Sequence, residues 1–427
     1  MRRLSVLFLI MFVLFSLTIV ACSGDDEDEN SGEEDAIDGD DDNNDDAVDD
    51  DDDDNDDDNN DDDTSPGLTD PGEYGPYAVG VTTRVFEYDT FAEDEKSIRH
   101  RPLLTEMWYP ILPADDIGPH DTPIDLFGKW GGLVEFIFNL LLPDDEMANM
   151  SIPFAPSRDV PIAPGGPFPV VLYSHGNASI RFAAHTTCEH LASRGFIVIA
   201  PDHPGNAFAA ALPDRLIIYN PLQSPADFLL RQEDMIHLLD VAEELNADDP
   251  LDFFTDKIDV TRAALVGHSF GGNTVLEVFR RDPRFSACVA QAGPDIPIIN
   301  DNMEGLLTFV SLEDHTLSGY TRLFRLIWRK APPPRLKIEF YLGGHYTYTD
   351  ACSLTPSLFG EGDGCGTGES VHTGEPIEFI DSTLGLEITN RYTTAWLEWR
   401  LLDLPHLNVI TQNLYPEHID HKVQLRE

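Results

Sequence analysis

Short β-branched runs alternate with stretches of helical periodicity from residue 66 to about residue 425. This alternation predicts an α/β fold with a mainly parallel sheet flanked by helices. The expected strands are 77–86, 103–109, 169–174, 196–200, 263–266, 288–291, 306–310 and 336–341. The expected helices are 185–194, 227–245, 273–281 and 391–402. No period of about 20 to 50 residues repeats in this region, so the pattern indicates a single α/β domain over residues 66–427.

A different pattern opens the chain. Residues 1–21 combine a charged start, an almost uninterrupted apolar run and a small residue before Cys22, which is typical of an export signal. Residues 19–22 (IVAC) resemble a bacterial lipobox, in which the signal is cut before a cysteine that carries a diacylglycerol. An uncleaved anchor is the alternative, since a spanning helix needs about 20 apolar residues. We expect a lipoprotein of the bacterial cell envelope, outside the cytoplasm and held to the membrane by Cys22.

The segment after Cys22 is extremely acidic. From residue 25 to 63, 26 of the 39 residues are Asp or Glu and none is Lys or Arg. Such a composition predicts a disordered linker, which we place at 22–65 together with the lipidated cysteine. The whole chain carries a formal net charge of −51, and about −27 remains without the signal and this segment. Nucleic acid is not expected as a partner, because phosphate binding needs basic patches.

Four further cysteines follow Cys22. Export places them in an oxidising compartment, where pairing is possible. Cys352 and Cys365 bracket a loop rich in Gly, Ser, Pro and Thr, so we expect a disulfide between them. No His or Cys pair with zinc-like spacing accompanies them, and no metal site is expected.

Residues 267–272 (GHSFGG) contain the most informative motif of the chain. Gly-x-Ser-x-Gly between a buried strand and a helix exposes the serine on a sharp turn, which predicts Ser269 as a nucleophile. The negative charge formed during acyl transfer needs preorganised N–H donors. We expect these donors to be the amide of Phe270 and the amide of Asn177, in the loop that follows strand 169–174. His175 in the same loop is interpreted as structural.

The remaining members of a catalytic triad should follow the nucleophile as acid and then histidine. His345 comes directly after strand 336–341 and is the expected general base, with His372 as a weaker rival. Asp314 stands just past strand 306–310 and is the favoured acid. Asp295, after the preceding strand, is the main alternative acid, and Glu313 is a third choice.

Residues 115–164 do not fit the strand and helix alternation. They carry Trp130 and an apolar stretch from 133 to 142. Two interpretations remain open for this insertion: a cap near the rim of the active site, over an acyl pocket, or extra packing on the sheet.

Several motifs in the same order resemble a branch of the α/β-hydrolases that contains platelet-activating factor acetylhydrolases, dienelactone-hydrolase-like proteins and cutinase-like polyester hydrolases. The matching segments are 77–81 (YAVGV), 108–110 (WYP), 174–176 (SHG), 191–196 (LASRGF), 267–272 (GHSFGG), 344–345 (GH) and 395–397 (AWL). The resemblance implies a serine esterase without a cofactor. The acetylhydrolases place the acid after the strand matching 288–291, whereas the polyester hydrolases place it where Asp314 stands. Dienelactone hydrolases use a cysteine where this chain has Ser269.

These features predict a serine hydrolase that cleaves carboxylic esters through an acyl-enzyme. One alternative is phospholipase activity, or activity like that of a platelet-activating factor acetylhydrolase, on membrane lipids. Another is a catalytically silent lipoprotein that binds a surface partner.

The amino-terminal pattern yields a first prediction. Intact-mass analysis of the protein extracted from the membrane fraction should show a cleaved chain with diacylglycerol on Cys22. A Cys22→Ser variant is the control and should lose the lipid mass. An unmodified amino terminus in the wild-type protein would contradict the lipoprotein assignment.

Overall fold

The computed structural model describes residues 69–91, 98–223, 225–293 and 299–426. The expected export signal, lipidated Cys22 and acidic linker lie outside these residues. Within them, no helix combines the length and the apolar character needed to cross a bilayer.

A ten-stranded sheet forms the centre of the described region, in the order β14-β11-β10-β9-β8-β4-β5-β2-β1-β3. The six strands from β11 to β5 run parallel, while β14 and β2 pair antiparallel with this group. The strands are β1 (Ala78–Phe91), β2 (Ile98–Ile111), β3 (Ser157–Arg158), β4 (Phe168–Ser174), β5 (Ile197–Asp202), β8 (Ile258–His268), β9 (Phe285–Gln291), β10 (Leu306–Ser311), β11 (Arg335–Phe340) and β14 (Ile419–Gln424). The expected α/β fold with a mainly parallel sheet is confirmed.

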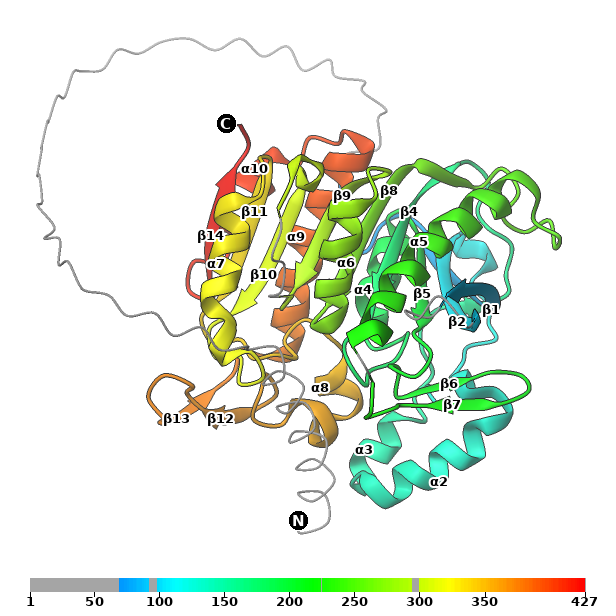
Figure 1. The fold of residues 1–427 in the computed structure, drawn as a ribbon, viewed down its shortest axis with the longest axis horizontal. Helices are drawn as coiled ribbons and strands as arrows, with labels where there is room; N and C mark the ends of the chain where they lie inside the picture. The colour runs from blue at the N-terminus through cyan, green and yellow to red at the C-terminus, as the bar shows by residue number, and fades with distance from the viewer. Residues whose placement is uncertain (1–68, 92–97, 224, 294–298, 427) are drawn as a thin grey trace, which may run out of the picture. The chain divides into compact units, whose positions relative to one another are not determined.

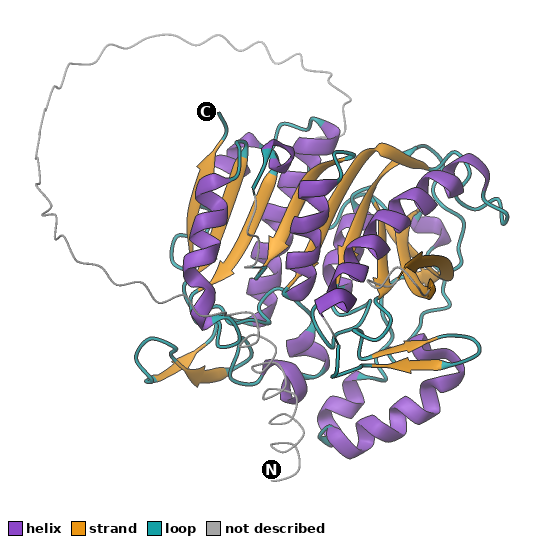
Figure 2. Cartoon of the chain, viewed as in Figure 1, coloured by secondary structure: helices purple, strands orange, loops and turns teal. Residues whose placement is uncertain are grey.

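Helices cover both faces of the sheet (Figures 1 and 2). One face carries α5 (Pro225–Asp248), α6 (Phe270–Arg281) and α7 (Thr321–Lys330), and the other carries α4 (His185–Ser193) and α9 (Ser382–Leu402). Shorter elements are α2 (Gly131–Leu141), α3 (Asp144–Asn149), α8 (Ala351–Leu354), α10 (Leu407–Thr411), and the hairpins β6 (Ala209–Ala211) with β7 (Leu216–Ile218) and β12 (Thr367–Glu369) with β13 (Pro376–Glu378). Helices connect several of the parallel neighbours, such as α4 between β4 and β5, α6 between β8 and β9 and α7 between β10 and β11.

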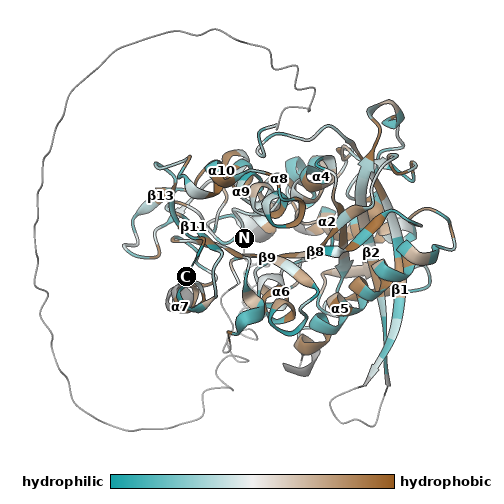
Figure 3. Cartoon of the chain, turned by 90° about the horizontal axis from the view of Figure 1, so that it is seen from above, coloured by the Kyte–Doolittle hydropathy of each residue, from teal (hydrophilic) through white to brown (hydrophobic). Residues whose placement is uncertain are grey.

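Hydrophobic burial explains why these segments adopt these elements. All seven residues of β4 and all six of β5 are buried, because helices cover both sides of these central strands. Along α5 the buried residues Met235, Leu238, Leu239, Ala242 and Leu245 recur at helical spacing and face the sheet. Hydrophobic colour appears along central strands such as β8, while the flanking helices mix hydrophobic and hydrophilic residues (Figure 3).

The structure corrects the expected start of the closing helix. The helix α9 begins at Ser382 rather than at residue 391, because the side chain of Asp381 accepts hydrogen bonds from the amides of Thr383 and Leu384. This cap satisfies amides that otherwise lack partners at a helix start. Strand β14 and helix α7 were also absent from the expected elements.

The insertion, residues 115–164, both packs on the sheet and reaches the site. Its last part forms β3, which pairs with β1. Its middle part is tied to the core by Arg181, a fully buried guanidinium that pairs with Glu106 and Asp202 and donates to the carbonyl of Leu126. Arg158 of the insertion also pairs with Glu106, so these ion pairs and the bond to Leu126 hold the insertion against β2 and β5.

Candidate active site

Ser269 lies on a sharp turn between β8 and α6. Its φ of 57° and ψ of −120° are a strained combination for a residue with a side chain. A Cβ atom on Gly271 would overlap the carbonyl of Ser174, and one on Gly267 would overlap the carbonyl of Gly271. Only glycine fits at these two positions, so the motif permits a turn that presents Ser269 at the carboxyl end of β8.

Ser269, His345 and Asp314 form a continuous hydrogen-bonded chain. The Oγ of Ser269 lies 2.8 Å from Nε2 of His345, and Nδ1 of His345 lies 2.8 Å from Oδ2 of Asp314. Because the carboxylate can only accept, Nδ1 of His345 donates to it and Nε2 accepts the serine proton. The structure thus brings together the three residues expected as nucleophile, base and acid.

The electrostatics of His345 are set by two carboxylates. Burial of the ring disfavours its charged form, but the charge and hydrogen bond of Asp314 and the charge of Asp363 outweigh this effect and raise the pKa of His345 above its ordinary value. A raised pKa strengthens the ring as a proton acceptor. It also stabilises the imidazolium that forms when the serine proton moves.

Asp363 is a residue that the sequence did not single out. Its Oδ1 accepts the amide of His345 at 2.8 Å and the amide of His315 at 2.9 Å. Its Oδ2 accepts both the amide and the hydroxyl of Thr316. One buried carboxylate therefore joins the loop that carries the base to the loop that carries Asp314.

His268 supports the base from the other side. Its Nε2 lies 2.8 Å from the carbonyl oxygen of His345, so the ring donates to the backbone of the base. Burial and the charge of His345 lower the pKa of His268 to about 3, which keeps the ring neutral. The sequence assigned no role to this position; its place inside the serine motif is the signal that could have identified it.

The rival assignments have different surroundings. His372 is exposed on the turn between β12 and β13. Glu313 accepts hydrogen bonds from Ser370 and Val371. Asp295, the alternative acid, lies outside the described residues.

The predicted oxyanion donors come from two different elements. Phe270 is the first residue of α6, where backbone amides lack acceptors within the helix. Asn177 lies in the loop after β4, and this loop passes so close to the nucleophile that a Cβ atom on Gly176 would lie 3.4 Å from Cβ of Ser269. The structure therefore places both predicted residues next to Ser269.

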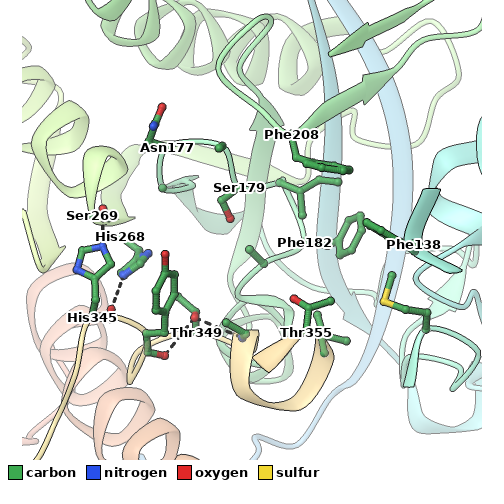
Figure 4. A pocket seen from close by; sticks show the side chains of 18 of the residues that line it. Phe138, Asn177, Ser179, Phe182, Phe208, His268, Ser269, His345, Thr349 and Thr355 are labelled. Atoms are coloured by element: carbon green, nitrogen blue, oxygen red, sulfur yellow. Dashed lines mark hydrogen bonds between the residues drawn. The ribbon is translucent and has the colours of Figure 1, made fainter. Parts of the chain in front are cut away.

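A pocket of about 790 Å³, counted with its open mouth, runs from Ser269 and His345 toward the insertion (Figure 4). Its walls are mainly aromatic and aliphatic. The apolar lining residues include Phe127, Phe138, Met150, Phe182, Phe208 and Leu354. Phe138 stacks on Phe208 at 5.6 Å between ring centroids, which closes the distal end of the wall. The insertion supplies Phe127, Phe138 and Met150, so it lies over the pocket.

A disulfide joins Cys352 to Cys365, as the loop composition predicted. The loop that it closes contains Leu354, which lines the pocket, and Asp363, which binds the amide of His345. Cys188 and Cys288 are free and buried. Among the described residues no group of His, Cys, Asp or Glu side chains is arranged to hold a metal ion.

Comparisons with known proteins agree with this geometry. Residues 169–352 match the family model of the α/β-hydrolase fold, and residues 66–216 match that of platelet-activating factor acetylhydrolase, isoform II. The chain is 23% identical to the platelet-activating factor acetylhydrolase of Gallus gallus over 278 residues, which are 56% of this chain and 63% of that protein. It is 25% identical to the enzyme of Bos taurus, over 78% of this chain and 77% of that one.

A solved structure gives the same result for the fold. The ferulic acid esterase from Streptomyces cinnamoneus superposes with a TM-score of 0.60 at 19% sequence identity. The superposition covers 77% of this chain and 92% of the esterase. The shared feature is the fold itself.

The position of Asp363 leads to a prediction about His345. Asp363→Asn should lower the pKa of His345, because it removes a negative charge that favours the imidazolium. The measurement is an NMR titration of the ring Hε1 signal, assigned by its absence in His345→Gln. Asp214→Asn, an exposed carboxylate of the β6–β7 turn, is the matched control and should leave the titration unchanged. A pKa that stays constant in Asp363→Asn would contradict the electrostatic role.

Proposed function

Since the chain has the α/β-hydrolase fold and is similar in sequence to the platelet-activating factor acetylhydrolases, we propose that it hydrolyses carboxylic esters as a serine esterase. The observation that carries this proposal is the hydrogen-bonded chain from Ser269 through His345 to Asp314 at the end of an apolar pocket. Each member lies within the distance that proton transfer needs.

The reaction follows from the donors and acceptors of the site. Ser269 attacks the ester carbonyl carbon while Nε2 of His345 takes its proton, and Asp314 stabilises the resulting imidazolium. The amides of Asn177 and Phe270 bind the negative oxygen of the tetrahedral intermediate. His345 then gives its proton to the leaving alkoxide, which departs as an alcohol. In the second half, His345 takes a proton from water as the water attacks the acyl carbon, and it returns this proton to Oγ of Ser269 as the acyl–Oγ bond breaks and the carboxylic acid leaves.

The pocket supports an apolar acyl group. Its aromatic wall lies on the insertion side of Ser269 and offers burial to an alkyl or aryl chain, with each buried methylene contributing about 0.8 kcal/mol. Ser179 and Thr349 add polar groups to the same lining.

Membrane lipids are a second candidate substrate, and one surface feature favours them. Leu133, Phe136 and Leu140 are exposed on one face of α2, the helix that supplies Phe138 to the pocket. An exposed apolar face on a helix that also lines the pocket fits contact with a lipid surface. We propose in addition that the protein is a lipid-anchored envelope protein, which the mass analysis of Cys22 tests.

The nucleophile can be tested directly. Ser269→Ala should lower kcat for p-nitrophenyl esters by about 10⁴-fold or more and abolish labelling by a fluorophosphonate, because it removes the hydroxyl that Nε2 of His345 binds. Ser286→Ala, on β9, is the control and should keep both. Full activity of Ser269→Ala, or a wild-type protein that is neither active nor labelled, would refute the esterase and leave the catalytically silent lipoprotein.

The acid can be tested by two substitutions measured side by side. Asp314→Asn should lower kcat by about 10⁴-fold, since an amide favours the wrong tautomer of His345. Asp295→Asn should retain activity close to that of the wild type. The opposite order of effects would make Asp295 the acid.

The lipid candidate depends on the exposed face of α2. A Phe136→Ser, Leu140→Ser double variant should hydrolyse phospholipid vesicles about tenfold more slowly, because two apolar side chains no longer enter the bilayer. Hydrolysis of soluble p-nitrophenyl acetate should not change. Leu251→Ser, an equally exposed site before β8, is the control. Equal vesicle rates in all three proteins would exclude this surface as the lipid contact.

A further inference from the structure

A second serine, histidine and aspartate set lies behind the candidate active site. Ser174 ends β4, His203 follows β5, and Asp234 lies on α5. The Oγ of Ser174 lies 2.9 Å from Nε2 of His203, and Nδ1 of His203 lies 2.8 Å from Oδ2 of Asp234. By these distances alone, Ser174 would qualify as a second nucleophile.

Burial excludes that role. Ser174, His203 and Asp234 are all fully buried, with 0% of each residue exposed. Among the described residues that line the pocket, Ser269 is included but Ser174 and His203 are not. Ser174 also lies within an extended, buried strand rather than on an exposed turn. An ester carbonyl has no path to its oxygen, so this set serves a different purpose.

The hydrogen bonds of the set can be oriented in only one way. Asp234 is bound by Arg101, whose charge lowers the pKa of the carboxyl group despite burial, so the carboxylate accepts from Nδ1 of His203. Nε2 of His203 must then accept the hydroxyl proton of Ser174. The lone pairs of Ser174 are left to accept from Nη2 of Arg231, at 2.8 Å. This series of hydrogen bonds therefore fixes the position of the guanidinium of Arg231.

Arg231 in turn contacts both halves of the predicted oxyanion hole. Its guanidinium donates to the carbonyl oxygen of His175 and to Oδ1 of Asn206. Asn206 donates to the side chain of Asn177 at 2.6 Å. On the other side, the guanidinium carbon lies 4.9 Å from the centre of the Phe270 ring. One buried side chain thus links the loop after β4 to the first residue of α6.

His203 holds the same loop through a second contact. Its amide donates to Nε2 of His175 at 3.2 Å, so Nδ1 of His175 carries the proton and donates to the carbonyl oxygen of Gly176 at 2.6 Å. Since a trans peptide points its C=O and N–H in opposite directions, this bond also sets the direction of the Asn177 N–H.

The cost of burying Arg231 indicates a functional reason for it. The side chain is fully buried, and its Nε has no acceptor among the described residues. Burial and the positive charge of Arg101 lower the pKa of Arg231 to about 9, although the negative charge of Asp234 acts in the opposite direction. Among the described side chains no carboxylate pairs directly with this guanidinium. Burying a guanidinium in this way destabilises a fold compared with an apolar side chain of similar size. Packing alone does not account for its presence.

We propose that Arg231, held by Ser174, His203 and Asp234, is the positioning residue of the oxyanion hole. It acts on no substrate atom. It keeps the amides of Asn177 and Phe270 at the spacing that the tetrahedral oxygen requires. This inference rests on the proposed esterase function, because it concerns the same site.

The test compares Arg231→Lys with Arg194→Lys. Arg194 is buried like Arg231, but its partner is the carboxylate of Glu398 and it lies away from the oxyanion loop. It therefore controls for the general cost of changing a buried arginine. Lysine cannot reproduce the forked contacts of Arg231. We expect Arg231→Lys to lower kcat by about 10²-fold with KM unchanged, because a misplaced donor acts only in the transition state. Affinity for a trifluoromethyl ketone, which forms the tetrahedral adduct, should fall by a similar factor.

Ser174→Ala keeps the test decisive if Arg231→Lys does not fold. It removes only the hydroxyl that orients Arg231, and it should lower kcat and trifluoromethyl ketone affinity together by about tenfold, again with KM unchanged. Unchanged values in folded variants, or an equal loss in Arg194→Lys, would overturn the proposal while leaving the esterase function intact. Inactivity and absent labelling of the wild-type protein would instead refute the esterase.

Fluorophosphonate labelling of Ser269→Ala tests whether Ser174 of the buried set can act as a nucleophile. The proposal expects no label on this variant. A label on Ser174 would make the buried set a second active site and overturn the proposal.

Discussion

The close approach of the β8–α6 turn to the end of β4 is the constraint on which the site depends. Gly271 packs against the carbonyl of Ser174 with no room for a side chain, and this contact seats Ser269 beside the Gly176–Asn177 loop. Because protein interiors are close-packed, the nucleophile and the oxyanion loop cannot shift independently. The same contact helps to hold the strained backbone of Ser269, whose φ is 57°.

The site then consists of two layers with different chemistry. The outer layer, Ser269 with His345 and Asp314, is positioned to exchange protons with a substrate. The inner layer around Arg231 is fully buried, and among the described partners of this layer Nε of Arg231 is the nitrogen left without an acceptor. The two hydrogen-bonded sets have similar interatomic distances, but the outer set can exchange protons with a substrate and the inner set cannot. Burial is the property that distinguishes the two sets.

Much of this arrangement was predictable from local pattern. Buried parallel strands are nearly continuous apolar runs, which is why β4, β5 and β8 could be identified. The serine motif located the turn, and the order of residues after the last parallel strands pointed to Asp314 and His345. What the sequence could not supply was the set of partners that fold back from elsewhere. His203, Arg231 and Asp363 sit in segments without a motif, and their roles exist only after tertiary packing. Strand β14 was missed because its sequence, IDHKVQ, is mostly polar at the sheet edge.

Asp363 illustrates how such a partner affects the comparison of related chains. Its carboxylate binds both the loop after β10 and the loop after β11, so the two loops are held together. The disulfide between Cys352 and Cys365 closes the segment that contains Asp363. A homologue could retain serine, acid and histidine in register and still lack this brace. A comparison based only on the three triad residues would count the active site of such a homologue as complete. Whether a related chain keeps a carboxylate at the position of Asp363 therefore bears on how its histidine is held, and the triad residues alone do not report it.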